Sequence, residues 1–295
     1  MIIVKLQGGL GNQMFQYAIG KKLSLLNKTE LKLDLSFLLD RTPRPNFTYR
    51  DYNLNIFNLK IEFATQEEIK PFINYLDSKI KRKIYTYLFL GKKNKYINEK
   101  KCNFNPDIFK LTGNIYLDGY WQTEKYFNDI KNILYNDFIV KTNQDQKNQD
   151  VAKTIKNTNS VSIHIRRGDY IDNKQIYHFH GICDLNYYYN CVNLLLKKLK
   201  NPNFFIFSDD HQWMKENLKL DYPMTFVDHN DASKNYEDLR LMSQCKHNII
   251  ANSSFSWWGA WLNQNPDKIV YAPQKWFNDT SKKTQDLIPD QWIRV

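Results

Sequence analysis

The feature that most constrains this fold is a regular alternation of strand-like and helix-like segments between residues 161 and 263. Short runs rich in β-branched and aromatic residues are each followed by a run of helical character. Strands are expected at residues 161–165, 203–208, 224–227 and 248–251, and helices at 185–199, 213–218, 236–245 and 255–263. Repeated βα units form a parallel sheet with helices on both faces. This half of the chain is therefore predicted to be an α/β domain.

The first half shows the same pattern less cleanly. It begins with a strand at residues 2–6, a glycine turn and a helix from about Gln13 to Leu26, and then come strands at 31–35 and 115–120 and a helix at 123–134. Residues 141–159 are rich in Asn, Gln, Lys, Asp and Thr and poor in apolar residues, which is typical of a domain boundary. We therefore expect two α/β domains, residues 1–150 and 151–295.

Composition is that of a globular enzyme of the cytoplasm. The 295 residues exceed the usual size of one core, and 42% of them are hydrophobic. The N-terminus enters a strand at once, and the longest apolar run, residues 85–90, is too short to span a bilayer. No zinc-like cysteine spacing, H-E-x-x-H or D-x-D occurs. We expect a cytoplasmic protein that uses no metal ion and no cofactor.

The net charge of +11 favours an anionic partner, which could be a nucleotide, a nucleic acid or an anionic membrane. Residues 79–101 carry nine Lys or Arg against a single Glu, interleaved with apolar and aromatic residues. Such a segment suits peripheral contact with the inner face of an anionic membrane. The alternative is a solvated helix whose apolar side joins the core. The aromatic, Asn-rich loops at 41–58 leave a similar choice between sugar stacking and ordinary packing.

Two arginines stand where the strand at residues 161–165 ends. Arg166 and Arg167 are followed by Gly168 and Asp169, so a carboxylate is close enough to fix one guanidinium. Ligands of open α/β sheets bind at the carboxyl ends of strands, and the planar donors of Arg match two phosphate oxygens at once. We infer a phosphate-bearing ligand. A surface ion pair is the alternative that these four residues alone leave open.

Other polar residues stand at the boundaries of predicted elements. Asn252, Ser253 and Ser254 precede a helix, where they either cap it or hold a phosphate together with its free amides. Asp209 and Asp210 follow a strand and suit either ribose hydroxyls or a metal ion. Asp238, in a helix, either accepts hydrogen bonds from a base or ribose or is simply solvated.

A glycine turn follows the first strand in Q-G-G-L-G-N-Q. Gly8, Gly9 and Gly11 allow the backbone to approach a ligand closely, and the amides at a helix start attract anions. The spacing is not G-x-G-x-x-G, so a dinucleotide-binding fingerprint is not supported. Such turns are common in α/β folds, and this one predicts a binding loop only in combination with the other motifs.

Three stretches together carry a family resemblance. They are G-G-L-G-N-Q-M-F-Q-Y, H-I-R-R-G-D-Y and N-S-S-F-S-W-W-G-A-W-L, in this order between Gly8 and Leu262. In this combination the chain resembles the bacterial α-1,2-fucosyltransferases of glycosyltransferase family 11. The resemblance implies a GT-B-type fold of two facing Rossmann-like domains, the N-terminal one on the acceptor side and the C-terminal one binding GDP-fucose. It also implies metal-independent, inverting transfer of L-fucose from GDP-fucose to the 2-hydroxyl of a terminal β-galactoside.

The resemblance assigns roles residue by residue. Arg166, with Asp169 of the same motif, would bind the β-phosphate, and Asn12 would reach the reaction centre. His164 and Asp238 would lie by the guanine. The remaining substrate-binding residues would be Gly9, Leu10, Gly11, Arg167, Asp209, Asp210, Asn252, Ser253, Ser254 and Phe255. The α-1,6 relatives place a glutamate where this chain has Lys174, so no catalytic base is carried over, and Asp172 is only a nearby candidate.

Two alternative functions remain open at this point. One is a glycosyltransferase of the same fold with another GDP-sugar, such as GDP-mannose. The other is a non-catalytic protein that binds a nucleotide or RNA through its basic surface. The ordered set of three motifs argues against the second, so no nucleic acid partner is expected. The acceptor beyond a β-galactoside is left undetermined, because acceptor loops vary on a common scaffold.

Overall fold

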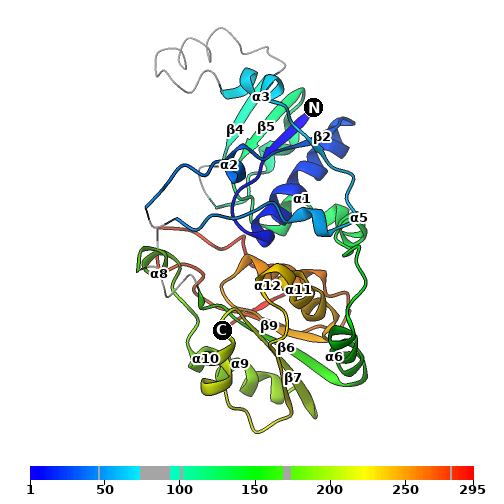
Figure 1. Cartoon of the computed structure of the whole chain (residues 1–295), viewed down its shortest axis with the longest axis vertical. Coiled ribbons are helices and arrows are strands. Elements are labelled where there is room, and N and C mark those ends of the chain that lie inside the picture. Colours follow the sequence, from blue (N-terminus) through cyan, green and yellow to red (C-terminus); the bar gives the residue numbers. More distant parts are fainter. Residues whose placement is uncertain (46, 74–93, 100–101, 169–173, 280) are drawn as a thin grey trace. The chain divides into compact units, whose positions relative to one another are not determined.

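The computed structural model describes residues 1–295 except residues 46, 74–93, 100–101, 169–173 and 280 (Figure 1). The chain divides into two compact units, Met1–Ile139 with Gln285–Leu287, and Val140–Thr284 with Ile288–Val295. The division falls before the boundary expected at residue 150. The polar segment that suggested that boundary contains helix α6 (Gln146–Asn157), which belongs to the second unit and buries only Asn148 and Ile155. A helix that buries so little apolar surface looks like a linker in sequence.

The first unit is built on a parallel sheet with the strand order β3-β2-β1-β5-β4. Its strands are β1 (Ile2–Lys5), β2 (Leu31–Asp34), β3 (Glu62–Phe63), β4 (Asn94–Asn98) and β5 (Asn114–Asp118). Its helices are α1 (Leu10–Asn27), α2 (Ser36–Leu39), α3 (Gln66–Ile73) and α5 (Lys131–Asp137), with short 3-10 turns η1 (Leu54–Ile56), η2 (Pro106–Lys110), η3 (Glu124–Tyr126) and η4 (Asn128–Ile130).

Two expectations for the first unit are corrected. Helix α1 begins at Leu10, not near Gln13, so the glycine turn is shorter than expected. The single helix expected at residues 123–134 is instead η3, η4 and α5, because the backbone of Phe127 (φ −147°) interrupts helical geometry. Close packing of α1 on β1 depends on Gly20, where an added Cβ would lie 2.5 Å from a methyl of Val4.

The second unit is built on a parallel sheet with the order β11-β10-β9-β6-β7-β8. Its strands are β6 (Asn159–Ile165), β7 (Pro202–Ser208), β8 (Met224–Val227), β9 (His247–Ile249), β10 (Val270–Ala272) and β11 (Ile293–Arg294). Its helices, besides α6, are α8 (Lys174–His180), α9 (Leu185–Leu196), α10 (His211–Asn217), the 3-10 turn η5 (Ala232–Lys234), α11 (Asn235–Gln244) and α12 (Ser254–Leu262). The predicted α/β class, two Rossmann-like units of the GT-B type, is confirmed.

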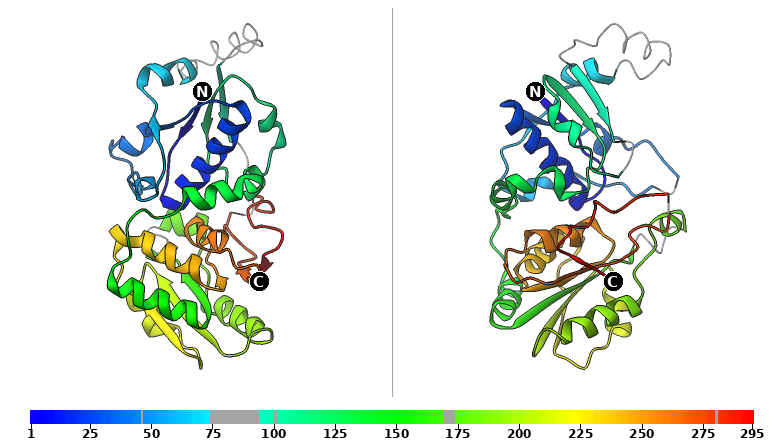
Figure 2. Two further views of the ribbon diagram at one scale, coloured as in Figure 1. Left: turned by 90° about the vertical axis from the view of Figure 1, so that its right-hand side faces the viewer. Right: turned by 180° about the vertical axis from the view of Figure 1, so that it is seen from behind.

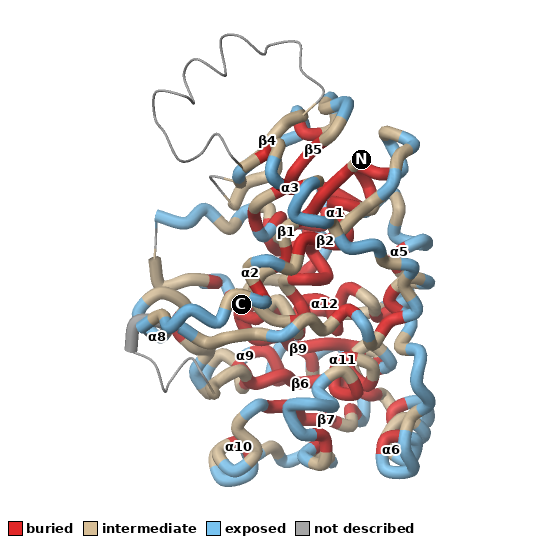
Figure 3. Tube along the Cα trace, turned by 45° about the horizontal axis from the view of Figure 1, so that its top comes forward, coloured by how far each residue is buried: buried red, intermediate tan, exposed pale blue. Residues whose placement is uncertain are grey.

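Helices cover both faces of the second sheet, as the views in Figure 2 show. On one face Val161, Ile163 and Ile165 of β6 pack with α9 and α10 in one buried cluster. On the other face α6 and α11 pack on Phe205 and Phe207 of β7, with Phe255 of α12 at the margin of that cluster. The central strands are accordingly buried along their length (Figure 3). Alternation along β6 and β7 thus assigns successive side chains to opposite faces.

Among the described residues, no helix combines the length and apolar character needed to cross a bilayer. The apolar run at residues 85–90 and most of the basic stretch 79–101 lie outside the described residues. Of that stretch, only β4 and Glu99 are described.

Candidate functional site

The strand order of the second unit creates a switch point between β6 and β9. From β6 the chain proceeds outward to β7 and β8, and it then returns to β9 on the opposite side of β6 before continuing to β10 and β11. In open parallel sheets, ligands bind outside the carboxyl ends of the strands at such a reversal. The residues that follow β6 and β9 are the motif arginines and the Asn-Ser-Ser run, so the topology brings these two motifs to one edge.

Arg166 is held by a carboxylate from the neighbouring strand. Its Nη1 lies 3.0 Å from Oδ2 of Asp209, while Oδ1 of the same carboxylate accepts the backbone N–H of Arg167 at 2.8 Å. Gly168 is required for this approach, because a Cβ there would lie 2.5 Å from Asp209 Oδ2. Asp209 was expected at a ribose or a metal ion. In the structure it orients the turn that presents Arg166.

Arg167 differs from its neighbour. Its guanidinium lies 3.7 Å from the ring centroid of Trp213 in α10, and its Nε lies 3.4 Å from Oδ2 of Asp210. Asp210 is also the N-cap of α10 and accepts the backbone N–H of Trp213 at 3.1 Å. These contacts tie Arg167 and Asp210 to α10. Among the described residues, Arg166 and Arg167 form ion pairs with Asp209 and Asp210. Asp169 and Asp172, which were expected nearby, lie outside the described residues.

The N-terminus of α12 forms the other side of this edge. Ser253 is its N-cap and its Oγ accepts the backbone N–H of Phe255 at 3.3 Å, and Ser254 is the first helical residue. Asn252 was expected at the substrate. Its Nδ2 instead donates to the carbonyls of His180 and Gly181 and, at 3.1 Å, of Trp276. Asn252 therefore clamps neighbouring loops, and the capped start of α12 is what faces the edge.

His164, the penultimate residue of β6, lies on the face of the sheet that carries α11 and α12. Its ring centroid is 5.6 Å from that of Phe255. Burial, with a smaller contribution from the charge of Arg166, lowers the pKa of His164 to about 3, so the ring is neutral. Its buried Nδ1 has no hydrogen-bond partner within the described ranges. A buried polar atom without a partner is rare in proteins and marks this ring as a candidate ligand contact.

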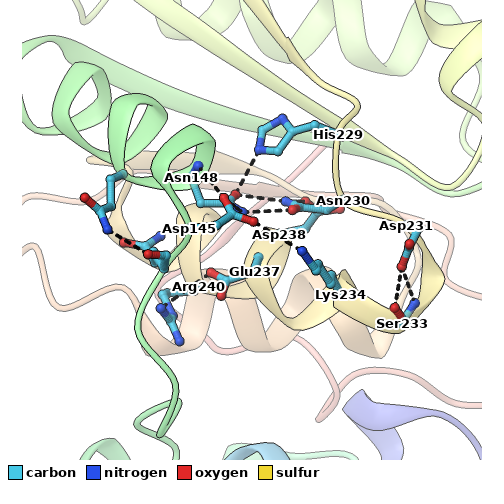
Figure 4. A network of polar contacts seen from close by, with 12 residues as sticks. Asp145, Asn148, His229, Asn230, Asp231, Ser233, Lys234, Glu237, Asp238 and Arg240 are labelled. Carbon is cyan, nitrogen blue, oxygen red and sulfur yellow. Dashed lines mark hydrogen bonds and ion pairs between the residues drawn. The ribbon is translucent and has the colours of Figure 1, made fainter.

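Asp238 stands in the first turn of α11, the helix that packs against α12. The residue is only 7% exposed, and burial, with a smaller contribution from Glu237, raises its pKa to about 7 despite a hydrogen bond from Asn230 that lowers it. A strongly perturbed carboxyl group at the edge of a sheet is a functional-site candidate. Its contacts form the polar network of Figure 4.

The glycine turn of the first unit leads into α1. Gly8 has φ +77°, and a Cβ there would lie 2.4 Å from Nδ2 of Asn12, so the turn requires glycine. The N-cap of α1 is Gly9 and no side chain caps it, so Asn12 does not cap this helix. Asn12 Oδ1 instead accepts a hydrogen bond of 2.7 Å from Gln122 Nε2. Leu10, expected in a binding loop with Gly9 and Gly11, is buried in the first turn of α1.

The structure thus groups the predicted residues in contact sets. Arg166, Arg167, Asp209 and Asp210 contact one another, and His164 contacts Phe255. Sequence analysis missed Trp213, Asn148 and Asn230. The D-x-x-N pattern before α6 signals an N-cap, but no sequence signal showed that these asparagines would meet Asp238. Within the part of the chain that is described, no group of three or more His, Cys, Asp or Glu side chains is placed to hold a metal ion.

Known proteins resemble this chain along its whole length. The sequence profile of Glycosyl transferase family 11 matches residues 1–295. The chain is 36% identical over 300 residues to an alpha-1,2-colitosyltransferase of Escherichia coli, covering 100% of this chain and 99% of that relative. It is 35% identical to the Escherichia coli O-antigen biosynthesis glycosyltransferase WbnK, covering 98% and 99%. In fold it is similar to a mutant of Arabidopsis thaliana FUT1 in complex with GDP, with a TM-score of 0.52, 9% identity and coverage of 93% of this chain and 71% of that one.

Proposed function

The chain belongs to glycosyl transferase family 11, and we propose that it transfers L-fucose from GDP-fucose to the 2-hydroxyl of a terminal β-galactoside. The transfer inverts the anomeric carbon and uses no metal ion or cofactor. The observation that carries the proposal is the position of Arg166, which Asp209 holds at the switch point of the second sheet. The N-terminus of α12 lies at the same edge of the sheet, after the neighbouring strand β9. This combination of a cation and a helix start suits a diphosphate.

The proposed mechanism follows from the leaving group. As the bond between fucose and the β-phosphate breaks, negative charge grows on GDP. Arg166 and the first amides of α12, with Ser253 and Ser254, are fixed before the reaction and stabilise that charge more in the transition state than in the ground state. Asp209 acts as a positioning residue for the guanidinium. In this proposal Asp238 and the neutral His164 contact the guanine, and Phe255 packs beside them.

Transfer of colitose is the second candidate, and the 36% identity to the alpha-1,2-colitosyltransferase favours it. Colitose is L-fucose that lacks the 3-hydroxyl. An enzyme that hydrogen-bonds this hydroxyl would discriminate strongly against the donor that lacks it, whereas one without such a contact would accept both sugars. The two candidates therefore share the diphosphate and guanine contacts and differ only at the sugar.

The acceptor is proposed to be a β-galactoside of a surface polysaccharide, as the O-antigen role in the name of the second relative suggests. We place the reaction in the cytoplasm. Peripheral contact of residues 79–101 with an anionic membrane is part of the same proposal, and flotation with vesicles containing anionic lipid tests it. Recovery of the protein with neutral vesicles only, or with none, would contradict that contact.

The function is tested by donor competition. The protein is incubated with a β-galactoside and with GDP-fucose, GDP-colitose or GDP-mannose, GDP release is measured, and the product linkage is determined by NMR. We expect acceptor-dependent GDP release with GDP-fucose and a bond to the 2-hydroxyl. A preference for GDP-colitose would select the second candidate. Turnover with GDP-mannose alone, or GDP binding without any transfer, would refute both.

A further inference from the structure

We infer that Asn148 and Asn230 are positioning residues that hold Asp238 as a hydrogen-bond acceptor for guanine, and that they thereby set the selectivity of the donor site for GDP over other purine nucleotides. The inference rests on the proposed function, because it assumes that a GDP-sugar is the donor. Neither asparagine stands in the three motifs that suggested the family. Asn148 belongs to the polar segment 141–159, and Asn230 lies between the strand expected at 224–227 and the helix expected at 236–245.

The two asparagines form a reciprocal amide pair (Figure 4). Asn148 Nδ2 donates to Asn230 Oδ1 at 2.9 Å, and Asn230 Nδ2 donates to Asn148 Oδ1 at 3.0 Å. Asn230 Nδ2 also donates to Asp238 Oδ1 at 2.8 Å, and Asn148 Nδ2 donates to Asp145 Oδ1 at 3.0 Å. His229 Nε2 lies 3.0 Å from Asn148 Oδ1. Asn148 is fully buried and Asn230 is 4% exposed, so the amide pair itself is shielded from water.

Asp145 fixes the direction of the bonds in this network. The backbone N–H of Asn148 lowers the pKa of Asp145, so this carboxylate only accepts hydrogen bonds and the amino group of Asn148 must face it. The reciprocal pair then turns the amino group of Asn230 towards Asp238. Both amide orientations are then determined, and Asn148 Oδ1 is left as an acceptor, so His229 Nε2 must carry a proton. A network with one allowed orientation presents Asp238 in one orientation.

The network connects elements that are separate in the sequence. Asp145 is the N-cap of α6, Asn230 follows β8, and Asp238 is in α11. Lys234 reaches back to Asp145 at 3.3 Å, outside the buried pair. The start of α11 is therefore held against the start of α6 by side chains that are already hydrogen-bonded before any ligand arrives. Preformed contacts of this kind reduce the cost of ordering a site on binding.

Asp238 retains a free acceptor for a ligand. Its Oδ1 accepts from Asn230, and across the described residues its Oδ2 has no protein donor. Guanine presents two adjacent donors, N1–H and the 2-amino group, which match the two oxygens of a carboxylate. Hypoxanthine keeps N1–H and lacks the amino group, and adenine presents an acceptor at N1. A carboxylate fixed in one orientation therefore favours guanine and rejects adenine.

The charges around Asp238 oppose its ionisation, so the amide donor matters. Burial and, less strongly, Glu237 raise the pKa of Asp238, and the hydrogen bond from Asn230 lowers it. Arg240 lies 3.5 Å from Glu237 and partly offsets that neighbour, while Lys234 pairs with Asp145. His229 reaches Asp238 only through the amide pair. Without the amino group of Asn230, the carboxyl group would be protonated over a wider range of pH and would accept fewer hydrogen bonds from guanine.

The test measures binding of GDP, IDP and ADP by calorimetry to the wild-type protein and to Asn230→Ala and Asn263→Ala. Asn263 is a matched control, because it is 2% exposed and its side chain also makes three hydrogen bonds, to Lys246, Asn248 and Asn265. It follows the C-terminal end of α12, whereas the proposed donor contacts lie at the start of that helix. Asn148→Ala is measured as well, so that the inference is tested even if Asn230→Ala does not fold.

We expect wild-type protein to bind GDP more tightly than IDP and IDP more tightly than ADP. Asn230→Ala should weaken the binding of GDP by roughly tenfold, as for loss of one hydrogen bond to a charged group. It should also bring the ratio of the affinities for GDP and IDP towards one. Its pH midpoint for GDP binding should also move upwards. Asn148→Ala should show the same changes to a smaller extent, because it acts through Asn230. Asn263→Ala should lower thermal stability and leave the ratio unchanged.

The positioning role would be overturned if Asn230→Ala kept the wild-type ratio of affinities for GDP and IDP and the wild-type pH midpoint, while the donor proposal would stand. If only Asn148→Ala folds, the same result in that variant has the same meaning. An equal loss of selectivity in Asn263→Ala would also overturn the positioning role, because the effect would then come from general destabilisation. If the wild-type protein bound no GDP at all, the proposed function itself would fail, and this outcome is distinct from the other two.

Discussion

At the edge of the second sheet, Arg166 and Asp238 are each oriented by another side chain, Asp209 and Asn230. At the edge of the first sheet, the conspicuous polar residues of α1 are instead bound by the backbone. Gln13 donates to the carbonyls of Gly8 and Asp51 and accepts the N–H of Asn53, and Gln16 makes a similar set with Gln7 and Gly119. Both glutamines are fully buried.

This difference separates scaffold from site. A buried amide that is satisfied by the backbone holds loops in place and cannot turn towards a ligand without leaving unpaired groups, which is costly. The second unit keeps the guanidinium of Arg166 at its switch point and the ionisable carboxyl group of Asp238 in the first turn of α11. The proposed function accordingly gives recognition of the charged donor to the second unit. In the first unit, Gln13 and Gln16 of the run N-Q-M-F-Q hold loops, and the role of Asn12 at the reaction centre stays a prediction.

The largest expected effect is that of Arg166→Lys. An ammonium group cannot reproduce the planar donors of a guanidinium, so turnover should fall by roughly 100- to 1000-fold, as for the loss of one preorganised donor. The matched control is Arg167→Lys, which loses the stacking on Trp213 and should lower melting temperature more than turnover. Steady-state rates and thermal denaturation of both variants are compared. If Arg166→Lys keeps more than about a third of the wild-type rate, the loss is far smaller than expected for one preorganised donor, and the phosphate role is contradicted.

Asn12→Ala should show the next largest effect, with kcat reduced by roughly tenfold and GDP affinity unchanged, because a contact made only at the reacting centre lowers turnover and not ground-state binding. Gln16→Ala is the matched control. It removes a buried amide bound by the backbone and should cost about 1–3 kcal/mol of stability, with little effect on kcat of the folded protein. Normal kcat in Asn12→Ala would mean that Asn12 is scaffold as well.

A smaller effect is expected from pH. The ionised form of Asp238 accepts hydrogen bonds, and with its pKa raised to about 7 this form is depleted as pH falls. GDP affinity should therefore be constant above pH 8 and should weaken severalfold below the pKa before it levels off, because a protonated carboxyl group still keeps an acceptor oxygen. Calorimetry from pH 5.5 to 8.5 measures the affinity for GDP. The control is Asp238→Ser, in which the phosphate of the ligand still ionises but the side chain at position 238 does not. Identical profiles for the two proteins would exclude Asp238 from the donor site.

No effect is expected from chelation. Activity measured in EDTA should equal that in buffer, because the proposal assigns charge stabilisation to Arg166 and the start of α12. Loss of activity in EDTA that Mg²⁺ or Mn²⁺ restores would show that a metal ion shares this role, with Asp209 and Asp210 as the first ligands to test.

Periodicity was sufficient to predict the parallel sheet of the second unit, because strands that are buried on both faces have a strong β-branched and aromatic signature. It did not predict α6, which buries only Asn148 and Ile155, or β10 and β11, which are short. The start of α1 was misplaced because Leu10 and Gly11 are unusual at a helix start, and only the turn at Gly8 shows where the helix begins.

Motifs at strand ends predicted which segments would meet at the edge, but they did not separate ligand contacts from supports. Arg166 and Arg167 are adjacent in sequence, and only the three-dimensional structure shows that one stacks on Trp213. The structure also shows that Asn252 donates to loop carbonyls, while its expected role at a phosphate stays a prediction. Asp238 bonds Asn230, which lies nearby in sequence, but Asn148 reaches this pair from a distant segment whose composition carries no signal, so pairing of this kind is visible only in the folded chain.

Hydrogen exchange with and without GDP tests the central claim, that the charged donor is recognised by the second unit, most directly. Amides that a ligand shields or that lie in a region it stabilises exchange more slowly, and mass spectrometry assigns them to short segments. We predict protection by GDP at the end of β6, the first turn of α11 and the start of α12, with none at the glycine turn before α1. Protection confined to that glycine turn, with none in the second unit, would contradict the account.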